Sequence, residues 1–176
     1  MIAASTGRRN RAYNRLMRFA VLTISDRCSN GVQTDTAGPA VVAVLRREWP
    51  AAAIETALLR DDEDAIAATL EEFARQGAAL VLTVGGTGLG PRDRTPEATR
   101  RMIDREAPGL AEAMRAKGAE RNSYAWLSRG VAGLRQKTLI VNLPGSRRGA
   151  EESLEAILVL LRHGIEVVGG SQNHPS

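Results

Sequence analysis

The sequence predicts an α/β protein: a three-layer α/β/α sandwich whose sheet is mostly parallel. Short apolar runs of strand type alternate along the 176 residues with segments in which apolar residues recur at helical spacing. A chain of this length with 43% hydrophobic residues can bury one substantial core, and no internal linker or repeat divides it. Strands that alternate with helices favour parallel pairing, with helices packed on both faces of the sheet.

The first half of the chain shows this alternation most clearly. Strands are expected at residues 19–24, 54–59 and 80–84, separated by helices at residues 36–49 and 62–76. Pro39 suits the first turn of the first helix, and Gly77 suits the end of the second. Each predicted helix is therefore bounded by a residue that favours a helix start or a helix end.

The second half continues with a helix that starts at Thr95. Threonine as the cap, Pro96 at the first helical position and an acid in the first turn are typical of a helix start. Pro108 interrupts this helix. The rest of the chain is expected to form a helical piece at residues 110–117, two tightly joined strands at 130–134 and 138–141, and a last helix at 149–163.

We expect one domain over residues 18–170, a disordered basic tail at residues 1–17 and a short tail at residues 171–176. Five arginines and no acid fall within the first 18 residues, and without these arginines the formal net charge of +4 becomes −1. The folded body is thus nearly neutral, and with 3% aromatic residues it is a poor candidate for nucleic-acid binding. The Arg-rich tail also resembles a transit peptide, which stays open as an alternative.

We further expect a cytoplasmic protein without a membrane segment. No apolar run approaches the roughly 20 residues that a transmembrane helix requires. Cys28 is the one cysteine, so the chain forms no internal disulfide and no cysteine metal cluster, which suits a reducing compartment.

The stretch VLTVGGTGLGPRDRTPE at residues 81–97 is a glycine-rich loop between a strand and a helix. Such loops commonly hold phosphates, because bare backbone N–H groups can surround an anion beside a helix N-terminus. The loop matches neither the Walker A motif nor the dinucleotide fingerprint, since Gly90 is followed by Pro91 and Arg92. The alternative is a tight turn that requires glycine for its backbone conformation.

Acidic residues follow two of the predicted strands, those at residues 54–59 and 80–84. Asp93 lies in the glycine loop, and an acidic run at residues 61–64 follows the preceding strand. Two carboxylates near a phosphate cradle suit Mg²⁺, which binds hard oxygen ligands and is often shared with a substrate phosphate. The alternatives are a surface ion pair for Asp93 and favourable helix N-terminal charge for the acidic run.

Two more loops leave the same predicted edge of the sheet. Ser25 and Asp26 follow the first strand, and NLPGS at residues 142–146 follows the last. Ligands in open α/β sheets bind at the carboxyl ends of the strands, so these loops could converge on one crevice. The combination favours metal-assisted phosphoryl or nucleotidyl transfer, although each loop taken alone could be an ordinary turn or cap.

Three motifs together resemble the molybdopterin adenylyltransferases, a group that includes the Mog and MoaB proteins and the gephyrin G domain. They are LTISDRCSNG with a later DTAGP, GGTGLGPRDRTPEAT, and LSRGVAGLRQKTLIVNLPGS, and the resemblance covers residues 19–170. It implies the molybdopterin-binding fold, usually as a trimer rather than a hexamer. The implied reaction transfers AMP from ATP to the terminal phosphate of molybdopterin with Mg²⁺, releases pyrophosphate and supplies a molybdate-insertion protein.

The resemblance assigns roles to residues of this chain. Asp62 and Asp93 match the two functional aspartates, which would be catalytic and bind Mg²⁺. Asp61 stands where the family usually has proline, so Asp61 is the alternative to Asp62. The implied phosphate and molybdopterin contacts are Ser25, Asp26, Gly85, Gly86, Thr87, Gly88, Ser128, Pro144, Gly145 and Ser146. The rival functions are a molybdopterin carrier without turnover and a molybdate-insertion domain.

Overall fold

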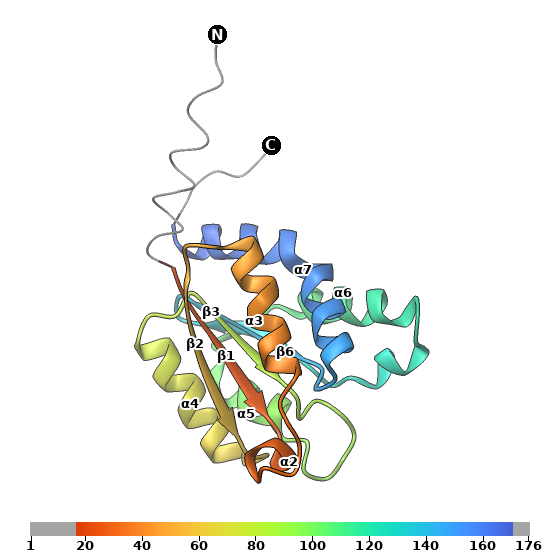
Figure 1. Cartoon of the computed structure of the whole chain (residues 1–176). Helices are drawn as coiled ribbons and strands as arrows, with labels where there is room; N and C mark the ends of the chain where they lie inside the picture. Colours follow the sequence, from red (N-terminus) through yellow and green to blue (C-terminus); the bar gives the residue numbers. More distant parts are fainter. Residues whose placement is uncertain (1–16, 171–176) are drawn as a thin grey trace.

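The computed structural model describes residues 17–170, which form one sheet with helices on both faces (Figure 1). The predicted tails at 1–17 and 171–176 lie outside the described residues, apart from Met17. Met17 is buried against the core. Within residues 17–170 no helix is both long enough and apolar enough to cross a membrane.

The sheet has six strands in the order β2-β1-β3-β6-β5-β4. The strands are β1 (Arg18–Ile24), β2 (Ala53–Leu59), β3 (Leu80–Val84), β4 (Arg105–Glu106), β5 (Ala132–Arg135) and β6 (Thr138–Leu143). Pairing is parallel from β2 through β1 and β3 to β6, while β5 and β4 continue the sheet in antiparallel pairs. The prediction of a mostly parallel sheet is confirmed.

Helices cover the two faces of this sheet in separate layers (Figure 1). The helices are α2 (Asp26–Ser29), α3 (Ala37–Glu48), α4 (Glu63–Arg75), α5 (Thr95–Met102), α6 (Pro108–Ala119), the 3-10 helix η1 (Ser123–Leu127) and α7 (Arg147–Val168). Buried residues of α3, α6 and α7 share one core, and buried residues of α4 and α5 share the other. The predicted three-layer architecture is therefore confirmed.

Alternation along β1 explains how one strand serves both cores. Phe19 and Val21 belong to the core under α3 and α7, whereas Ala20 and Leu22 belong to the core under α4. All four side chains are almost completely buried. Trp49 closes the first core with its ring edge-on to Phe19 at a centroid distance of 5.3 Å. Burial of each large apolar side chain contributes about 1.5–3 kcal/mol, so this strand stabilises both cores.

The helix after the glycine loop differs from the prediction at both ends. Thr95 is its first residue rather than its cap, and the Thr95 hydroxyl donates to the Gly85 carbonyl at 2.9 Å. The helix ends at Met102, well before Pro108, because the following chain joins the sheet. The Asp104 amide donates to the Leu134 carbonyl at 2.7 Å, and this bond leads into β4. Long-range pairing with β5 thus ends a helix that local sequence would have continued.

The last strand and helix are both longer than predicted. Strand β6 continues to Leu143, so Asn142 lies in the strand and not in the following loop. Helix α7 continues through Gly164 to Val168, because Leu161 and Ile165 bury consecutive turns on the same face. Burial of this face offsets the low helix propensity of one glycine.

The strand order creates a switch point beside β1. The chain passes from β1 to β2 on one side of β1, and then to β3 on the other side. The segments after β1 and β3 therefore leave the carboxyl edge as neighbours at the point where an open α/β sheet has its natural crevice. This edge is where all the predicted site loops lie.

Asn142 is a buried polar side chain that ties several of these elements together. Its amide nitrogen donates to the hydroxyls of Thr83 on β3 and Thr99 on α5 at 2.9 and 2.8 Å. Its carbonyl oxygen accepts from the Val131 amide at 3.1 Å. The side chain thus has three partners on three segments, and each partner would lose a hydrogen bond if it were removed.

We expect Asn142→Ala to lower the free energy of unfolding by about 2–3 kcal/mol, because it removes three buried hydrogen bonds. Urea denaturation followed by circular dichroism measures this change. Thr83→Val is the control: it keeps the side-chain shape, removes one partner, and should cost about 1 kcal/mol. Equal stabilities of the Asn142→Ala variant and the unmodified chain would contradict this role.

Candidate active site

Two adjoining hollows open at the carboxyl ends of the parallel strands. Their volumes are about 550 Å³ and about 290 Å³. Gly86, Asp93 and Gly145 line both hollows, so the glycine loop after β3 and the loop after β6 form the wall between them. A site with two compartments that share one carboxylate suits two ligands that meet at that group.

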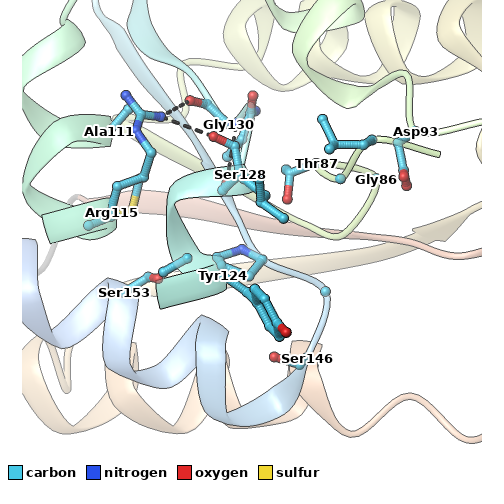
Figure 2. Close-up of a pocket in the computed structure, with 18 of the residues that line it drawn as sticks. Gly86, Thr87, Asp93, Ala111, Arg115, Tyr124, Ser128, Gly130, Ser146 and Ser153 are labelled. Carbon is cyan, nitrogen blue, oxygen red and sulfur yellow. Dashed lines mark hydrogen bonds between the residues drawn. The ribbon is translucent and has the colours of Figure 1, made fainter. Parts of the chain in front are cut away.

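The larger hollow lies between the glycine loop, α6, η1 and the start of α7 (Figure 2). Asp93 and Arg115 are the charged residues in its lining, and Figure 2 shows them at opposite ends. One Arg115 nitrogen donates to the carbonyls of Ser128 and Gly130 at 3.4 and 3.1 Å. The rest of the lining combines small hydroxyl side chains with apolar groups and the exposed ring of Tyr124, so it can receive a ring system and an anionic group together.

The smaller hollow is acidic on balance. Its charged lining residues are four aspartates and two arginines: Asp26, Asp35, Asp61, Asp93, Arg27 and Arg92. The Asp26 amide donates to the Asp61 carboxylate at 3.0 Å, and the Asp61 amide donates to the Asp26 carboxylate at 3.2 Å. Arg92 forms an ion pair with the Asp26 carboxylate. These reciprocal bonds hold the loop after β1 against the loop after β2, so both carboxylates keep fixed positions.

Close backbone approach explains the glycines at the centre of the site. Gly85 and Gly86 have φ angles of 108° and 63°, in the left-handed region that favours glycine. A Cβ atom on Gly86 would clash with the Thr95 hydroxyl, and one on Gly145 would lie 3.1 Å from the Gly85 Cα atom. The two predicted cradles are therefore in direct contact. The tight-turn interpretation and the cradle interpretation describe the same loop, since Gly86 has a left-handed backbone conformation and lines both hollows.

The Asp93 carboxylate folds back over its own loop. The Gly90 amide donates to the Asp93 carboxylate at 2.8 Å. A Cβ atom on Gly88 would lie 2.9 Å from the same carboxylate oxygen. Glycine at both positions thus leaves room for this side chain, and the loop places a negative group at the border of the two hollows.

The two neighbouring acids at the end of β2 lie in different surroundings, and the predicted residue, Asp62, is the one outside both hollows. Asp62 is the exposed N-cap of α4, where its carboxylate accepts from the Ala65 amide at 2.8 Å. Asp62 lines neither hollow, whereas Asp61 lines the smaller hollow with Asp93. The carboxylate that the structure brings beside Asp93 is Asp61, the alternative residue, because the helix start takes Asp62.

The other predicted contact residues all line one of the hollows. Ser25, Asp26 and Gly85 line the smaller one; Thr87, Gly88, Ser128, Pro144 and Ser146 line the larger one; Gly86 and Gly145 line both. Two of the serines also cap helices: the Ser25 hydroxyl accepts from the Cys28 amide, and the Ser146 hydroxyl accepts from the Gly149 amide, each at 3.2 Å. Their hydroxyl groups therefore start α2 and α7 at the rim of the site.

Sequence reasoning missed the far wall of the larger hollow. Arg115 comes from α6 and Tyr124 from η1 (Figure 2). Neither residue belongs to a strand-end loop, and only the packing of α6 against α7 brings this segment over the site. A local motif contains no signal for such a placement.

The acidic hollow shifts the titration of Asp61. Burial raises the pKa of Asp61 above its ordinary value, and the charges of Asp26 and Asp93 raise it further. The hydrogen bond from the Asp26 amide and the charge of Arg92 act in the opposite direction but do not cancel the increase. Three carboxylates thus repel one another in a partly desolvated space, which is the electrostatic environment that a bound cation would relieve.

The family model described as "probable molybdopterin binding domain" matches residues 20–163. The chain belongs to this family. Among solved structures, the molybdopterin-binding domain is similar to the molybdopterin biosynthesis enzyme MoaB of Thermus thermophilus, with 48% identity and a TM-score of 0.82. That match covers 88% of this chain and 98% of the MoaB chain.

Curated relatives of this molybdopterin-binding domain are of two sizes. A molybdopterin adenylyltransferase of Haemophilus influenzae is 40% identical over 144 residues, which are 81% of this chain and 73% of that protein. The molybdenum cofactor synthesis protein cinnamon of Drosophila melanogaster is 37% identical over 152 residues, which are 86% of this chain. The chain spans 25% of cinnamon, so it corresponds to one part of that larger protein.

We expect Asp61→Asn to raise the melting temperature of the domain at pH 7. The folded domain holds the Asp61 proton more tightly than the unfolded chain does, so the ionised carboxylate reduces stability above its folded pKa. Asparagine keeps an acceptor for the Asp26 amide and removes the charge. The gain should vanish as the pH falls below about 4, where an ordinary aspartate is protonated.

Calorimetry or thermal denaturation between about pH 3.5 and 8 measures this effect, a range that spans the ordinary aspartate pKa. Asp62→Asn is the matched control, because asparagine caps a helix as well as aspartate does and position 62 is exposed. The Asp62→Asn variant should show no pH-dependent gain. A melting temperature for Asp61→Asn that stays below that of the unmodified domain at pH 7 would rule out the repulsion.

Proposed function

We propose that the chain is a molybdopterin adenylyltransferase that transfers AMP from ATP to the terminal phosphate of molybdopterin and releases pyrophosphate. One observation supports this reaction above the others: two hollows share Asp93 and the glycines of two loops. A transfer between two phosphate-bearing substrates needs such a border, because the donor and acceptor phosphates must meet. The similarity to a curated molybdopterin adenylyltransferase at 40% identity supports the same reaction.

The chain's own groups suit this chemistry through position and charge. A phosphate oxygen of molybdopterin bonds to the α-phosphorus of ATP, and the bond from that phosphorus to the pyrophosphate oxygen breaks. Gly86 and Gly145 lie at the border of the two hollows, and the 22-residue helix α7 starts just after Ser146. Backbone N–H groups and a helix N-terminus stabilise phosphate charge there. This displacement needs no covalent enzyme intermediate, so no nucleophile paired with a histidine is required.

The carboxylates of the smaller hollow fit a magnesium ion. Asp61 and Asp93 would hold Mg²⁺, which would neutralise charge on the ATP phosphates. Burial raises the pKa of Asp61 most, the charges of Asp26 and Asp93 raise it further, and a cation would offset the repulsion from those charges. Among residues 17–170 no group of three or more potential ligands is arranged to hold a metal by itself. Mg²⁺ does not need such a group, because it commonly combines one or two carboxylates with substrate phosphates and water.

The rival function is a molybdopterin carrier without turnover. A carrier needs the larger hollow but has no use for a second hollow lined by four carboxylates. Both functions include molybdopterin binding, whereas only the transferase produces pyrophosphate from ATP. The assay can be repeated with molybdate or tungstate to detect metal insertion, which is the other rival.

We expect Asp93→Asn and Asp61→Asn each to reduce pyrophosphate release by about 10²-fold or more, because each removes a charge at the border of the hollows. The assay contains Mg²⁺, ATP and molybdopterin. Asp62→Asn should retain the activity of the unmodified enzyme, since Asp62 lines neither hollow. Full activity of Asp93→Asn, or loss of activity in Asp62→Asn with Asp61→Asn unaffected, would reverse the assignment.

We also propose a trimer that works in the cytoplasm and passes its product to a molybdate-insertion protein, as the family resemblance implies. Multi-angle light scattering after gel filtration tests the assembly. The expected mass is three times the 18.9 kDa of the chain. A mass of one or six chains would refute the trimer.

A further inference from the structure

Arg129 lies directly behind the glycine loop and contacts it at three carbonyl groups. The Arg129 amide donates to the Thr87 carbonyl at 2.9 Å, and the side-chain Nε donates to the Gly88 carbonyl at 2.7 Å. A second guanidinium nitrogen donates to the Asp93 carbonyl. Arg129 itself lines neither hollow, so these contacts hold the loop without placing the guanidinium in the ligand space.

The planar peptide bond lets these contacts fix the direction of the N–H groups of Gly88 and Leu89. In a planar trans peptide, the carbonyl of one residue and the N–H of the next point in opposite directions. The described residues contain no cis peptide bond. Because Arg129 holds the carbonyls of Thr87 and Gly88, the N–H groups of Gly88 and Leu89 must point away from Arg129. Gly88 and Leu89 both line the larger hollow, where two adjacent N–H groups can bind an anion.

The same guanidinium spans the loop from Gly88 to Asp93. Its bond to the Asp93 carbonyl sets the backbone that bears the candidate catalytic carboxylate. The planar guanidinium therefore fixes the Leu89 N–H and the backbone of Asp93, while the Arg129 backbone amide orients the Gly88 N–H through the Thr87 carbonyl. Lysine cannot reproduce this arrangement, because its ammonium is a single point and the arginine fork has several donors in fixed directions.

Glu97 on α5 supplies the counter-charge. Arg129 and Glu97 form an ion pair, with 32% and 29% of their side chains exposed. Burial raises the pKa of Glu97, but hydrogen bonds from Arg129 and from its own backbone, with the charges of Arg129 and Arg94, hold the pKa below its ordinary value. Glu97 thus stays ionised at neutral pH and anchors the guanidinium to the helix that follows the loop.

We propose that Arg129 is a positioning residue, which aims the Gly88 and Leu89 N–H groups at a phosphate or pyrophosphate group and fixes Asp93 beside it. This inference deepens the proposed function and rests on it for the phosphate nature of the ligand. Arg129 touches neither substrate nor reacting atoms, and its effect passes through the loop.

The experiment compares Arg129→Ala and Arg129→Lys with Arg135→Ala in the full chain. Arg135 is a matched control: its side chain is 28% exposed and pairs with Glu71 and Asp104, and it lines neither hollow. Three quantities are measured: kcat and KM for pyrophosphate release, the Kd of inorganic pyrophosphate by titration calorimetry without metal, and the melting temperature. The kinetic assay of Arg129→Ala is repeated with millimolar guanidinium ion.

For Arg129→Ala we expect kcat to fall about 10²-fold, as a misplaced catalytic group predicts, and pyrophosphate to bind about tenfold more weakly. Arg129→Lys should retain the charge and still lose at least about tenfold in kcat, because one ammonium cannot bridge Gly88 and Asp93. Guanidinium ion should restore part of the kcat of Arg129→Ala. Arg135→Ala should change the melting temperature only.

The inference is overturned if Arg129→Lys keeps the kcat and the pyrophosphate Kd of the unmodified enzyme, or if the unmodified chain does not bind pyrophosphate. Should Arg129→Ala fail to fold, Arg129→Lys decides the matter alone. A chain that releases no pyrophosphate, but binds it more weakly after Arg129→Lys, would contradict the proposed transferase and support the positioning role. Normal turnover in all three variants would contradict the positioning role and leave the transferase intact.

Discussion

Parallel pairing of β1, β3 and β6 is the constraint on which the rest of this molecule depends. The register aligns Thr23 with Val84 and Val84 with Leu143, so three strands end at one level of the sheet. Every loop that lines the two hollows leaves from this level or packs over it. The close contact between Gly85 and Gly145 is possible only because the preceding strands are adjacent and end together.

The loops at this edge show a conflict between stability and the proposed chemistry. Asp26 and Asp61 are bound to each other through reciprocal backbone hydrogen bonds, although their charges repel. Gly85 and Gly86 occupy backbone conformations that exclude ordinary side chains. The buried strands and the Asn142 hydrogen bonds supply the stability that these loops lack, so the sheet supports a site that could not form alone.

The sequence predicted most of the fold because long elements have clear periods and clear ends. Strands at 19–24 and 80–84 and the helices between them match the structure within a residue or two. The elements that were missed, α2, β4 and η1, have two to five residues and no buried apolar run to reveal them, and β4 exists only through its pairing with β5.

Site residues that depend on long-range contacts were likewise beyond prediction from the sequence. Loops at strand ends were found because motif and topology agree there. The choice between Asp61 and Asp62 could not be made from adjacent acids, since either can cap a helix and only geometry shows which one does. Arg115, Tyr124 and Arg129 act across the fold, through contacts between segments that are distant in the sequence.

The buried amide of Asn142 has a consequence for how this family could diversify. Asn142 lines the larger hollow, yet both of its donors and its acceptor already serve Thr83, Thr99 and Val131. Asn142 can therefore contact a bound ring but has little hydrogen-bonding capacity left for it. Other polar lining, such as Asn122 and Tyr124, comes from the segment around η1. Evolution could retune ligand preference in that segment while the sheet stayed unchanged.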